Sequence, residues 1–140
     1  MLFRSPRDIL NQMKNLEIKS KSNDGFFLNI AINYGGRDEI IRATKKIVKN
    51  VINKKLNVSE IDSHNFSNYL DTAGQKDPDL IIRTAGERRL SNFLLWQISY
   101  SELYFSDEMW PDFSKQSLRN AIDCYKARER KFGNLKKIAN

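Results

Sequence analysis

The chain has 140 residues, the size of one ordinary domain, and its hydrophobic content of 40% is enough for a core, which excludes an intrinsically disordered protein. Its formal net charge of +7 favours anionic partners: nucleic acid, phosphorylated metabolites or an acidic membrane surface. The lysines are spread along the chain rather than clustered, so charge alone does not choose among these partners.

Cysteine content and hydropathy indicate where the protein works. Cys124 is the only cysteine, which excludes an internal disulfide and a cysteine metal cage and favours a cytosolic setting. No apolar run approaches the ~20 residues that span a membrane, and residues 1–6 lack a signal-peptide core. We therefore expect a soluble, cytoplasmic protein, with contact to a membrane surface left open.

The first elements in chain order are a helix and a strand. Ser5 and Pro6 form a strong helix start, and the apolar spacing after them predicts a helix to about Glu17. After a polar loop, the run Phe26–Asn33 is almost continuously apolar. That pattern is typical of a strand that is covered on both faces in a parallel sheet.

A second helix follows a glycine turn. Gly35 and Gly36 permit a tight turn, and the acidic residues after them suit a helix N-terminus. The predicted helix has an apolar face made of Ile40, Ile41, Thr44, Ile47, Val48, Val51 and Ile52. The turn Asn33–Arg37 lies where open α/β sheets bind ligands, yet a purely structural turn explains the glycines equally well.

A short helix is predicted next, capped by Asp62 or Ser63 and ending near Leu70. It contains His64, the only histidine of the chain. The sequence offers this histidine no metal partner, and a lone exposed histidine is more often incidental than catalytic. We therefore assign His64 no function.

The stretch 77–97 is the most informative part of the chain. Its apolar run Leu80–Ile82 predicts a buried strand, and Ser91 is expected to cap a helix over residues 92–101. The run ends at Arg83, and the loop after it carries Glu87, Arg88 and Arg89. Guanidinium groups bind phosphate oxygens in pairs, and helix N-termini offer unpaired N–H groups to anions. The stretch therefore predicts an anion site, and solvated surface arginines are the weaker alternative.

The last elements complete an α/β pattern. Glu102–Phe105 predicts a third short strand, Trp110–Phe113 a rigid aromatic turn, and Ser114 caps a final helix that ends in a basic tail. The apolar face of that helix is expected to consist of Leu118, Ala121, Ile122 and Tyr125. Strands that alternate with helices indicate a parallel sheet with flanking helices, in one domain over residues 1–140. Three strands are few for such a sheet, whose two faces both need cover.

Four segments resemble signature regions of the cis-prenyltransferases, whose nearest members are the bacterial undecaprenyl diphosphate synthases. They are residues 27–40, 78–98, 101–113 and 128–133, and the resemblance covers most of the chain. Family members are longer, so the resemblance implies the C-terminal part of their fold. Their Asp-Gly-Asn-Gly-Arg-type loop, which binds the allylic diphosphate and carries the catalytic aspartate, has no counterpart in this sequence. We therefore expect no catalytic residue in this chain.

The resemblance also implies the site residues. Arg83, Arg89 and Ser91 match the family residues that bind the diphosphate of isopentenyl diphosphate, the chain-extending substrate. Glu102 matches a glutamate that is associated with Mg²⁺. One carboxylate is a poor magnesium site by itself, because this ion prefers near-octahedral oxygen coordination. In the family, the aspartate of the absent loop completes the site.

Other positions depart from the family pattern or extend it. Arg88 stands where some members have histidine, and Ala85 where glycine or serine is common, a change that matters if the backbone there needs a positive φ. Arg128 and Arg130 resemble C-terminal arginines that lie near the family's dimer interface. A homodimer, or pairing with another chain of the family, is therefore expected.

The implied reaction joins isopentenyl diphosphate to an allylic diphosphate in cis geometry and releases diphosphate, which yields a polyprenyl diphosphate of the undecaprenyl carrier-lipid type. The growing product needs an apolar tunnel, and the run Phe26–Ile32 could line that tunnel or belong to the core. The main alternative is a non-catalytic subunit or truncated remnant that acts only with a partner chain. A basic nucleic-acid-binding module ranks last, because the sequence has no recognised nucleic-acid motif.

Overall fold

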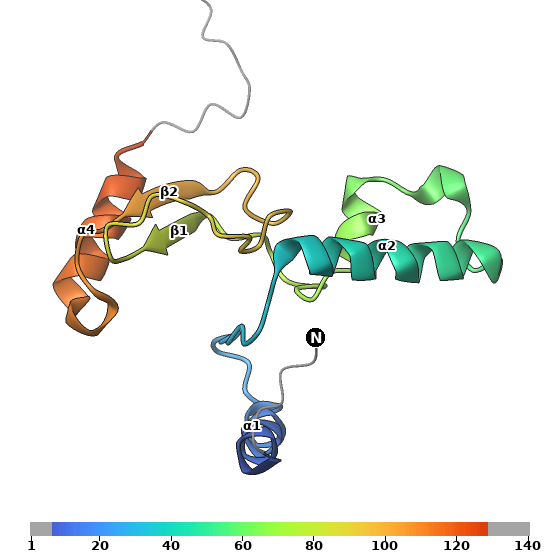
Figure 1. Ribbon diagram of the computed structural model, residues 1–140, viewed down its shortest axis with the longest axis horizontal. Coiled ribbons are helices and arrows are strands. Elements are labelled where there is room, and N and C mark those ends of the chain that lie inside the picture. The colour runs from blue at the N-terminus through green and yellow to red at the C-terminus, as the bar shows by residue number, and fades with distance from the viewer. Residues whose placement is uncertain (1–6, 129–140) are drawn as a thin grey trace, which may run out of the picture. The chain divides into compact units, whose positions relative to one another are not determined.

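The computed structural model describes residues 7–128, and the chain divides into two compact units, Met1–Tyr34 and Gly35–Asn140 (Figure 1). Helices and a parallel sheet are both present, which confirms the predicted α/β class. Among the helices of residues 7–128, none is both long and apolar enough to cross a bilayer. One domain over residues 1–140 stays a prediction.

In the described part of the first unit, helix α1 spans Arg7–Ser20. It confirms the predicted helix and continues to Ser20 rather than ending near Glu17, while its predicted start at Ser5 lies outside the described residues. Asp8 in the first turn and Lys19 in the last turn suit the helix dipole. At the C-terminal end, Ser20 Oγ donates a hydrogen bond to the Leu16 carbonyl (2.8 Å).

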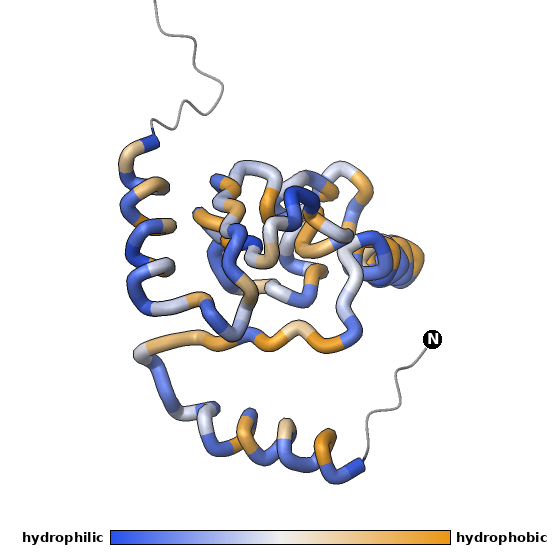
Figure 2. Tube along the Cα trace, turned by 60° about the vertical axis from the view of Figure 1, so that its left-hand side comes forward, coloured by the Kyte–Doolittle hydropathy of each residue, from blue (hydrophilic) through white to orange (hydrophobic). Residues whose placement is uncertain are grey.

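The strand predicted over Phe26–Asn33 is wrong, because these residues have no regular secondary structure. The residues are hydrophobic in sequence (Figure 2), yet Phe26 is 80% exposed and Ile30 69% exposed. An apolar run becomes a strand only when a neighbouring strand pairs with its backbone N–H and C=O groups. The two-stranded sheet found within residues 7–128 does not include this segment.

In the second unit, helix α2 spans Gly36–Ile52 and confirms the second predicted helix. Ala43 and Ile47 are its buried apolar residues. The apolar face expected from the sequence is wider than the face that is covered, since Ile41, Val48 and Ile52 are at least half exposed. The predicted packing of that face is therefore only partly correct.

A buried carboxylate lies in the first turn of α2. Glu39 is 1% exposed, and its Oε1 accepts hydrogen bonds from the Asp71 backbone N–H (2.8 Å) and from Gln97 Nε2 (3.1 Å). Gln97 is 2% exposed and also donates to Thr72 Oγ1 (3.1 Å). A charge is tolerated inside a protein only when hydrogen bonds compensate for lost hydration, so these bonds tie α2 to two distant loops.

Helix α3 spans Ser63–Ser67 and therefore ends before Leu70, near which its end was expected. Asp62 caps it, as predicted, by accepting from the Asn65 N–H (2.7 Å). Trp96 fixes its position, because the Trp96 ring lies 4.3 Å from the Phe66 ring and its Nε1 donates to Ser67 Oγ (3.1 Å). The 3₁₀ turn Val58–Glu60 precedes α3.

The sheet consists of β1, Leu80–Arg83, and β2, Glu102–Phe105, which run parallel with Leu80 opposite Glu102 and Arg83 opposite Phe105. Both strands were predicted. All their residues are half-buried, which fits a sheet that is covered incompletely by the described residues. The carboxyl ends of both strands meet at the Arg83–Phe105 end of the sheet.

The helix predicted over residues 92–101 is wrong, because this segment is a series of turns. Ser91, Asn92 and Leu94 have φ values of 48°, 64° and 44°, which belong to the left-handed region and interrupt a right-handed helix. Burial of the segment's apolar residues is uneven, since Ile98 is 6% exposed and Phe93 is 41% exposed. The apolar spacing of residues 92–101 therefore does not correspond to a helix.

The C-terminal elements agree with the sequence. The 3₁₀ helix Trp110–Asp112 forms the aromatic turn, in which the Trp110 and Phe113 rings stack 6.4 Å apart. Ser114 caps α4, Lys115–Lys126, by accepting from the Ser117 N–H, and α4 packs beside β2 (Figure 1). Ala121 is fully buried, whereas Leu118 and Ile122 of the predicted apolar face are partly exposed. Arg130 lies outside the described residues.

Candidate functional site

Arg83 lies at the carboxyl end of β1, where the strand leads into residues 84–90, called the arginine loop below. Its Nη1 donates to the Arg89 carbonyl (2.6 Å) and to Ser91 Oγ (3.0 Å). These two bonds use one nitrogen of the guanidinium group and fix the orientation of the whole planar fork. The Nε and Nη2 donors make no bond to the described residues, so they are available to an anion.

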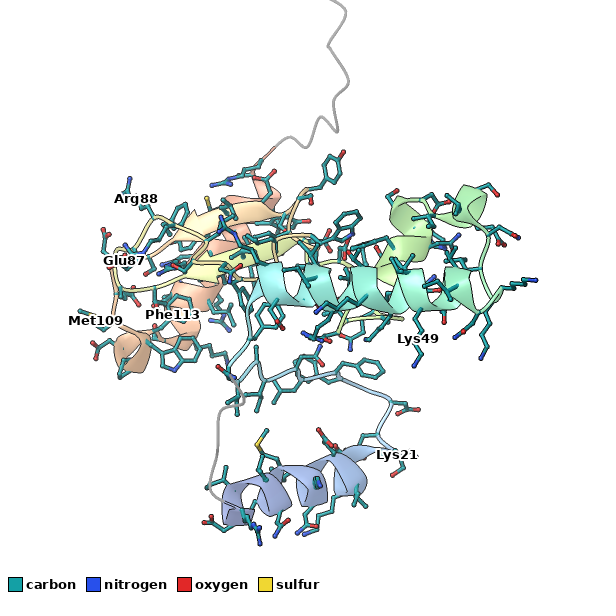
Figure 3. The ribbon with its side chains drawn as sticks, turned by 45° about the vertical axis from the view of Figure 1, so that its right-hand side comes forward. Lys21, Lys49, Glu87, Arg88, Met109 and Phe113 are labelled. Carbon is teal, nitrogen blue, oxygen red and sulfur yellow. The ribbon has the colours of Figure 1, made fainter. Side chains whose placement is uncertain are left out.

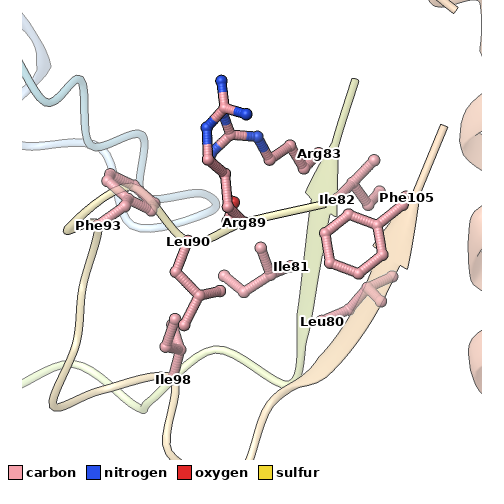
Figure 4. A pocket seen from close by; sticks show the side chains of 9 residues that line it. All are labelled: Leu80, Ile81, Ile82, Arg83, Arg89, Leu90, Phe93, Ile98 and Phe105. Carbon is pink, nitrogen blue, oxygen red and sulfur yellow. The ribbon is translucent and has the colours of Figure 1, made fainter. Parts of the chain in front are cut away.

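A pocket of about 230 Å³ lies beside this guanidinium group. The pocket is lined by Leu80, Ile81, Ile82, Arg83, Arg89, Leu90, Phe93, Ile98 and Phe105. The guanidinium groups of Arg83 and Arg89 lie together at one end, and apolar side chains from both strands and from the 90–98 segment form the rest (Figure 4). A ligand that suits this pocket has an anionic head and a short apolar body.

The other charged residues of the loop lie differently. Arg89 forms an ion pair with Glu87 through Nη1, and its side chain is 64% exposed. Arg88 is exposed, does not line the pocket, and points away from the loop (Figure 3). The structure therefore brings Arg83 and Arg89 together at the pocket and leaves Arg88 outside the pocket.

Ala85 and Gly86 give the arginine loop its shape. Both have φ values of 66°, in the left-handed region. The Ala85 N–H donates to the Glu108 carbonyl (2.7 Å), and the Gly86 N–H donates to the Ser106 carbonyl (2.9 Å). The backbone at Ala85 therefore has the positive φ at which a change from glycine to alanine matters. Alanine adopts this conformation at a cost of about 1–2 kcal/mol.

Ser91 does not cap a helix, so the part of the anion-site prediction that relied on a helix N-terminus is wrong. The Ser91 backbone is left-handed, and its hydroxyl accepts a hydrogen bond from Arg83 instead. The site contains arginine side chains and a serine that holds one of them. The prediction that Arg83, Arg89 and Ser91 bind a diphosphate stays a prediction.

Glu102 opens β2 and lies opposite Leu80, three residues from Arg83 along the strand. At about 3.3 Å per residue, the two backbones are separated by roughly 10 Å along the sheet. Glu102 Oε2 accepts a hydrogen bond from Arg128 Nη1 (2.7 Å), and this hydrogen bond raises the pKa of Arg128 above its ordinary value. Glu102 is therefore the counter-ion of Arg128.

The described residues do not fit a complete magnesium site. Within residues 7–128, no group of three or more histidine, cysteine, aspartate or glutamate side chains could hold a metal ion. Glu102 supplies one carboxylate, and this carboxylate already forms an ion pair with Arg128. Mg²⁺ needs several oxygen ligands. Neither His64, which is exposed, nor the half-buried thiol of Cys124 belongs to a metal cluster in this part of the chain.

Asn92 is a residue that the sequence reasoning missed. Its carbonyl accepts from the Gly36 N–H (2.7 Å), and its Oδ1 accepts from the Arg37 N–H (2.9 Å). The N–H groups of Gly36 and Arg37 at the start of α2 therefore donate to Asn92 and are not available to a ligand. The one sequence signal was an asparagine directly after Ser91, since asparagine is enriched at left-handed backbone positions.

Comparison with known proteins supplies the family. Residues 2–133 match the family model described as "Putative undecaprenyl diphosphate synthase". The chain therefore belongs to the undecaprenyl diphosphate synthase family of prenyltransferases.

Two relatives and one solved structure illustrate the match. The chain is 48% identical over 132 residues to an isoprenyl transferase of Aquifex aeolicus, a match that covers 94% of this chain and 54% of that protein. It is 49% identical over 128 residues to a ditrans,polycis-undecaprenyl-diphosphate synthase, specific for (2E,6E)-farnesyl diphosphate, of Buchnera aphidicola, with coverages of 91% and 51%. A crystal structure of lavandulyl diphosphate synthase from Lavandula x intermedia with dimethylallyl diphosphate matches with a TM-score of 0.89 and 39% identity, over 93% of this chain and 56% of that one. The chain thus spans about half the length of these relatives.

Proposed function

We propose that this chain carries the isopentenyl diphosphate site of a cis-prenyltransferase, an enzyme that condenses isopentenyl diphosphate with an allylic diphosphate to make a polyprenyl diphosphate. The observation that supports the proposal is the pocket with Arg83 and Arg89 at one end and apolar side chains elsewhere, in a chain of the prenyltransferase family. The printed names of relatives include synthases of undecaprenyl diphosphate.

Each part of the pocket has a task in this proposal. Arg83, oriented by the Arg89 carbonyl and by Ser91 Oγ, presents Nε and Nη2 to one phosphate, and the Arg89 guanidinium binds the other. The five-carbon isopentenyl group lies against the apolar lining, where the buried Ile98 and the half-buried Phe105 exclude water. The two arginines stabilise the negative charge of the substrate and hold the nucleophilic double bond in one place.

The resemblance implies magnesium, and Glu102 is the residue of this chain that would hold it. Because Glu102 is one carboxylate and is paired with Arg128, no step is assigned to the metal. A homodimer, contact with a membrane surface and a cytosolic location are likewise parts of the proposal, the last supported by the single cysteine.

Calorimetric titration with isopentenyl diphosphate tests the proposal. Each charge-assisted hydrogen bond contributes about 1.5–3 kcal/mol, so Arg83→Ala and Arg89→Ala should each weaken binding roughly tenfold to a hundredfold. Arg88→Ala is the matched control, because Arg88 belongs to the same loop, carries the same charge and lies outside the pocket. Undiminished binding by the Arg83→Ala/Arg89→Ala double variant would overturn the proposal.

The alternative is a non-catalytic subunit or remnant that acts only with a partner chain. The observation that favours it is that Glu102 supplies a single carboxylate, which is paired with Arg128. Incubation with labelled isopentenyl diphosphate, farnesyl diphosphate and Mg²⁺ separates the two, because a subunit should bind the labelled substrate and form no product alone. Polyprenyl product from the purified chain would contradict the alternative.

A further inference from the structure

The strongest unassigned feature of the second unit is the connection between Asn92 and the start of α2. Helix α2 begins after Gly35, whose lack of a side chain leaves it without a cap of its own. The orphan N–H groups of Gly36 and Arg37 instead donate to the carbonyl and Oδ1 of Asn92, at 2.7 and 2.9 Å. One asparagine, 55 residues further along the chain than Arg37, thus caps the helix.

The packing around this cap leaves no room for larger residues. A Cβ atom at Gly35 would lie 2.9 Å from Asn92 Nδ2, and one at Gly36 would lie 2.9 Å from Leu95 Cγ and 3.0 Å from the Leu95 backbone nitrogen. Asn92 itself has a φ of 64°, which asparagine tolerates better than most residues. The two glycines and the asparagine therefore form one close contact between α2 and the 91–95 segment.

The same peptide segment holds the anion site at its other end. Ser91, directly before Asn92, accepts from Arg83 Nη1 through its hydroxyl (3.0 Å), and the Arg89 carbonyl accepts from the same nitrogen (2.6 Å). Residues 89–92 are therefore fixed at α2 by Asn92 and at β1 by Arg83. If the contact at α2 is released, the Ser91 hydroxyl and the Arg89 backbone lose their fixed position.

We propose that Asn92 is a positioning residue for diphosphate binding: by capping α2, it holds Ser91 and the Arg89 backbone, which orient the Arg83 guanidinium and fix the point from which the Arg89 side chain extends. This inference rests on the proposed isopentenyl diphosphate site. Asn92 contacts no ligand in it. Its effect is to set the distance between the two arginines, and so the preference of the site for a diphosphate over a single phosphate.

Asn92→Gly tests the inference, because glycine keeps the left-handed backbone and removes Oδ1. We expect pyrophosphate binding to weaken roughly tenfold, which corresponds to the loss of one charge-assisted hydrogen bond between Arg83 and the ligand. The ratio of pyrophosphate affinity to orthophosphate affinity should also fall. Gly36→Ala disturbs the same contact from the helix side and should have the same effect with Asn92 intact. It also supplies the result if Asn92→Gly does not fold.

A matched control separates positioning from general destabilisation. Asp62→Ala removes the cap of α3, so it should lower the melting temperature without changing the affinity ratio. Amide hydrogen exchange gives a second measurement: Asn92→Gly should speed the exchange of the Arg37 N–H, which loses its acceptor Oδ1, more than that of the Gly36 N–H, whose acceptor is the backbone carbonyl of residue 92. Adding Ser91→Ala to Asn92→Gly should weaken binding little further, because the proposal has Asn92 act partly through Ser91.

The outcomes distinguish this inference from the proposed function. If Arg83→Ala/Arg89→Ala abolishes pyrophosphate binding while Asn92→Gly and Gly36→Ala bind pyrophosphate as the unaltered chain does, the role of Asn92 is overturned and the site stands. If the unaltered chain binds neither pyrophosphate nor isopentenyl diphosphate, the proposed function fails, and the inference fails with it.

Discussion

At the scale of single residues, Arg83 has a structural task that the structure shows and a ligand-binding task that we propose. Its Nη1 is committed to the Arg89 carbonyl and to Ser91, while the other edge of the guanidinium plane remains for a ligand. A side chain that is fixed before the ligand arrives loses less conformational entropy on binding than a free arginine. This arrangement explains why a serine belongs to an arginine site.

Ala85 is the residue at which a simple substitution should stabilise the protein. Ala85→Gly removes a left-handed cost of about 1–2 kcal/mol and loses about 0.4–1 kcal/mol through greater freedom of the unfolded chain. We therefore expect the free energy of unfolding, measured by urea denaturation, to rise by roughly 0.5–1 kcal/mol.

Ala73 provides the control for this substitution. It is also an exposed alanine in a turn, but its φ is not positive, so Ala73→Gly should lower the free energy of unfolding. Equal destabilisation by both substitutions would show that the conformation of Ala85 carries no strain.

At the scale of elements, local signals in the sequence were sufficient where an element depends on its own residues. The helices α1, α2 and α4 have amphipathic spacing, and Asp62 and Ser114 cap α3 and α4 as predicted. The run Phe26–Asn33 and the segment 92–101 were predicted wrongly for different reasons. A strand needs a partner, and the left-handed residues at 91–94 serve contacts with α2 that lie far away in the sequence.

The same distinction applies to the candidate site. The resemblance identified Arg83, Arg89 and Ser91, and the structure brings them together. Asn92 was missed because its partners are backbone N–H groups, which have no residue signature, and its one sequence signal concerned only the backbone conformation. The pairing of Glu102 with Arg128 was also missed, since it joins the start of β2 to the residues that follow α4.

Helix α2 is tied to the loop after α3 by an ion pair whose contribution should depend on pH. Arg42 donates to both carboxylate oxygens of Asp71, at 2.8 and 2.6 Å, and this hydrogen bonding holds the pKa of Asp71 below its ordinary value. A lowered pKa means that the stabilisation is complete above about pH 4 and is lost as the pH falls through the pKa of the folded state.

Asp71→Asn should therefore lower the free energy of unfolding at pH 7 and make little difference in strong acid. The side chains are each 42% exposed, so solvent screening limits the effect to about 1 kcal/mol or less. Urea denaturation at pH 7 and near pH 2.5 measures the difference, and Asp38→Asn, at a 74% exposed partner of Arg42, should have a smaller effect. A difference between Asp71→Asn and the unaltered chain that persists undiminished at pH 2.5 would contradict the ion-pair explanation.

At the scale of the whole molecule, the chain combines a pocket that contains two arginines with apolar surfaces that the described residues leave uncovered. The pocket has two arginines and an apolar lining, and no group of three or more possible metal-ligand side chains (His, Cys, Asp or Glu) that could hold a metal occurs within residues 7–128. The apolar run around Phe26 and Ile30 is largely exposed, as are parts of α2. Both features accord with a chain that spans about half of the prenyltransferases it resembles.

A crystal structure of the chain with isopentenyl diphosphate tests the central claim most directly. The account predicts that the diphosphate lies at the Arg83–Arg89 end of the pocket, with phosphate oxygens about 2.7–2.9 Å from guanidinium nitrogens of both residues, and that the isopentenyl group contacts the apolar lining. Diphosphate bound at another place, such as at Lys45, Lys46 and Lys49 of α2, with the Arg83–Arg89 pocket empty, would contradict it.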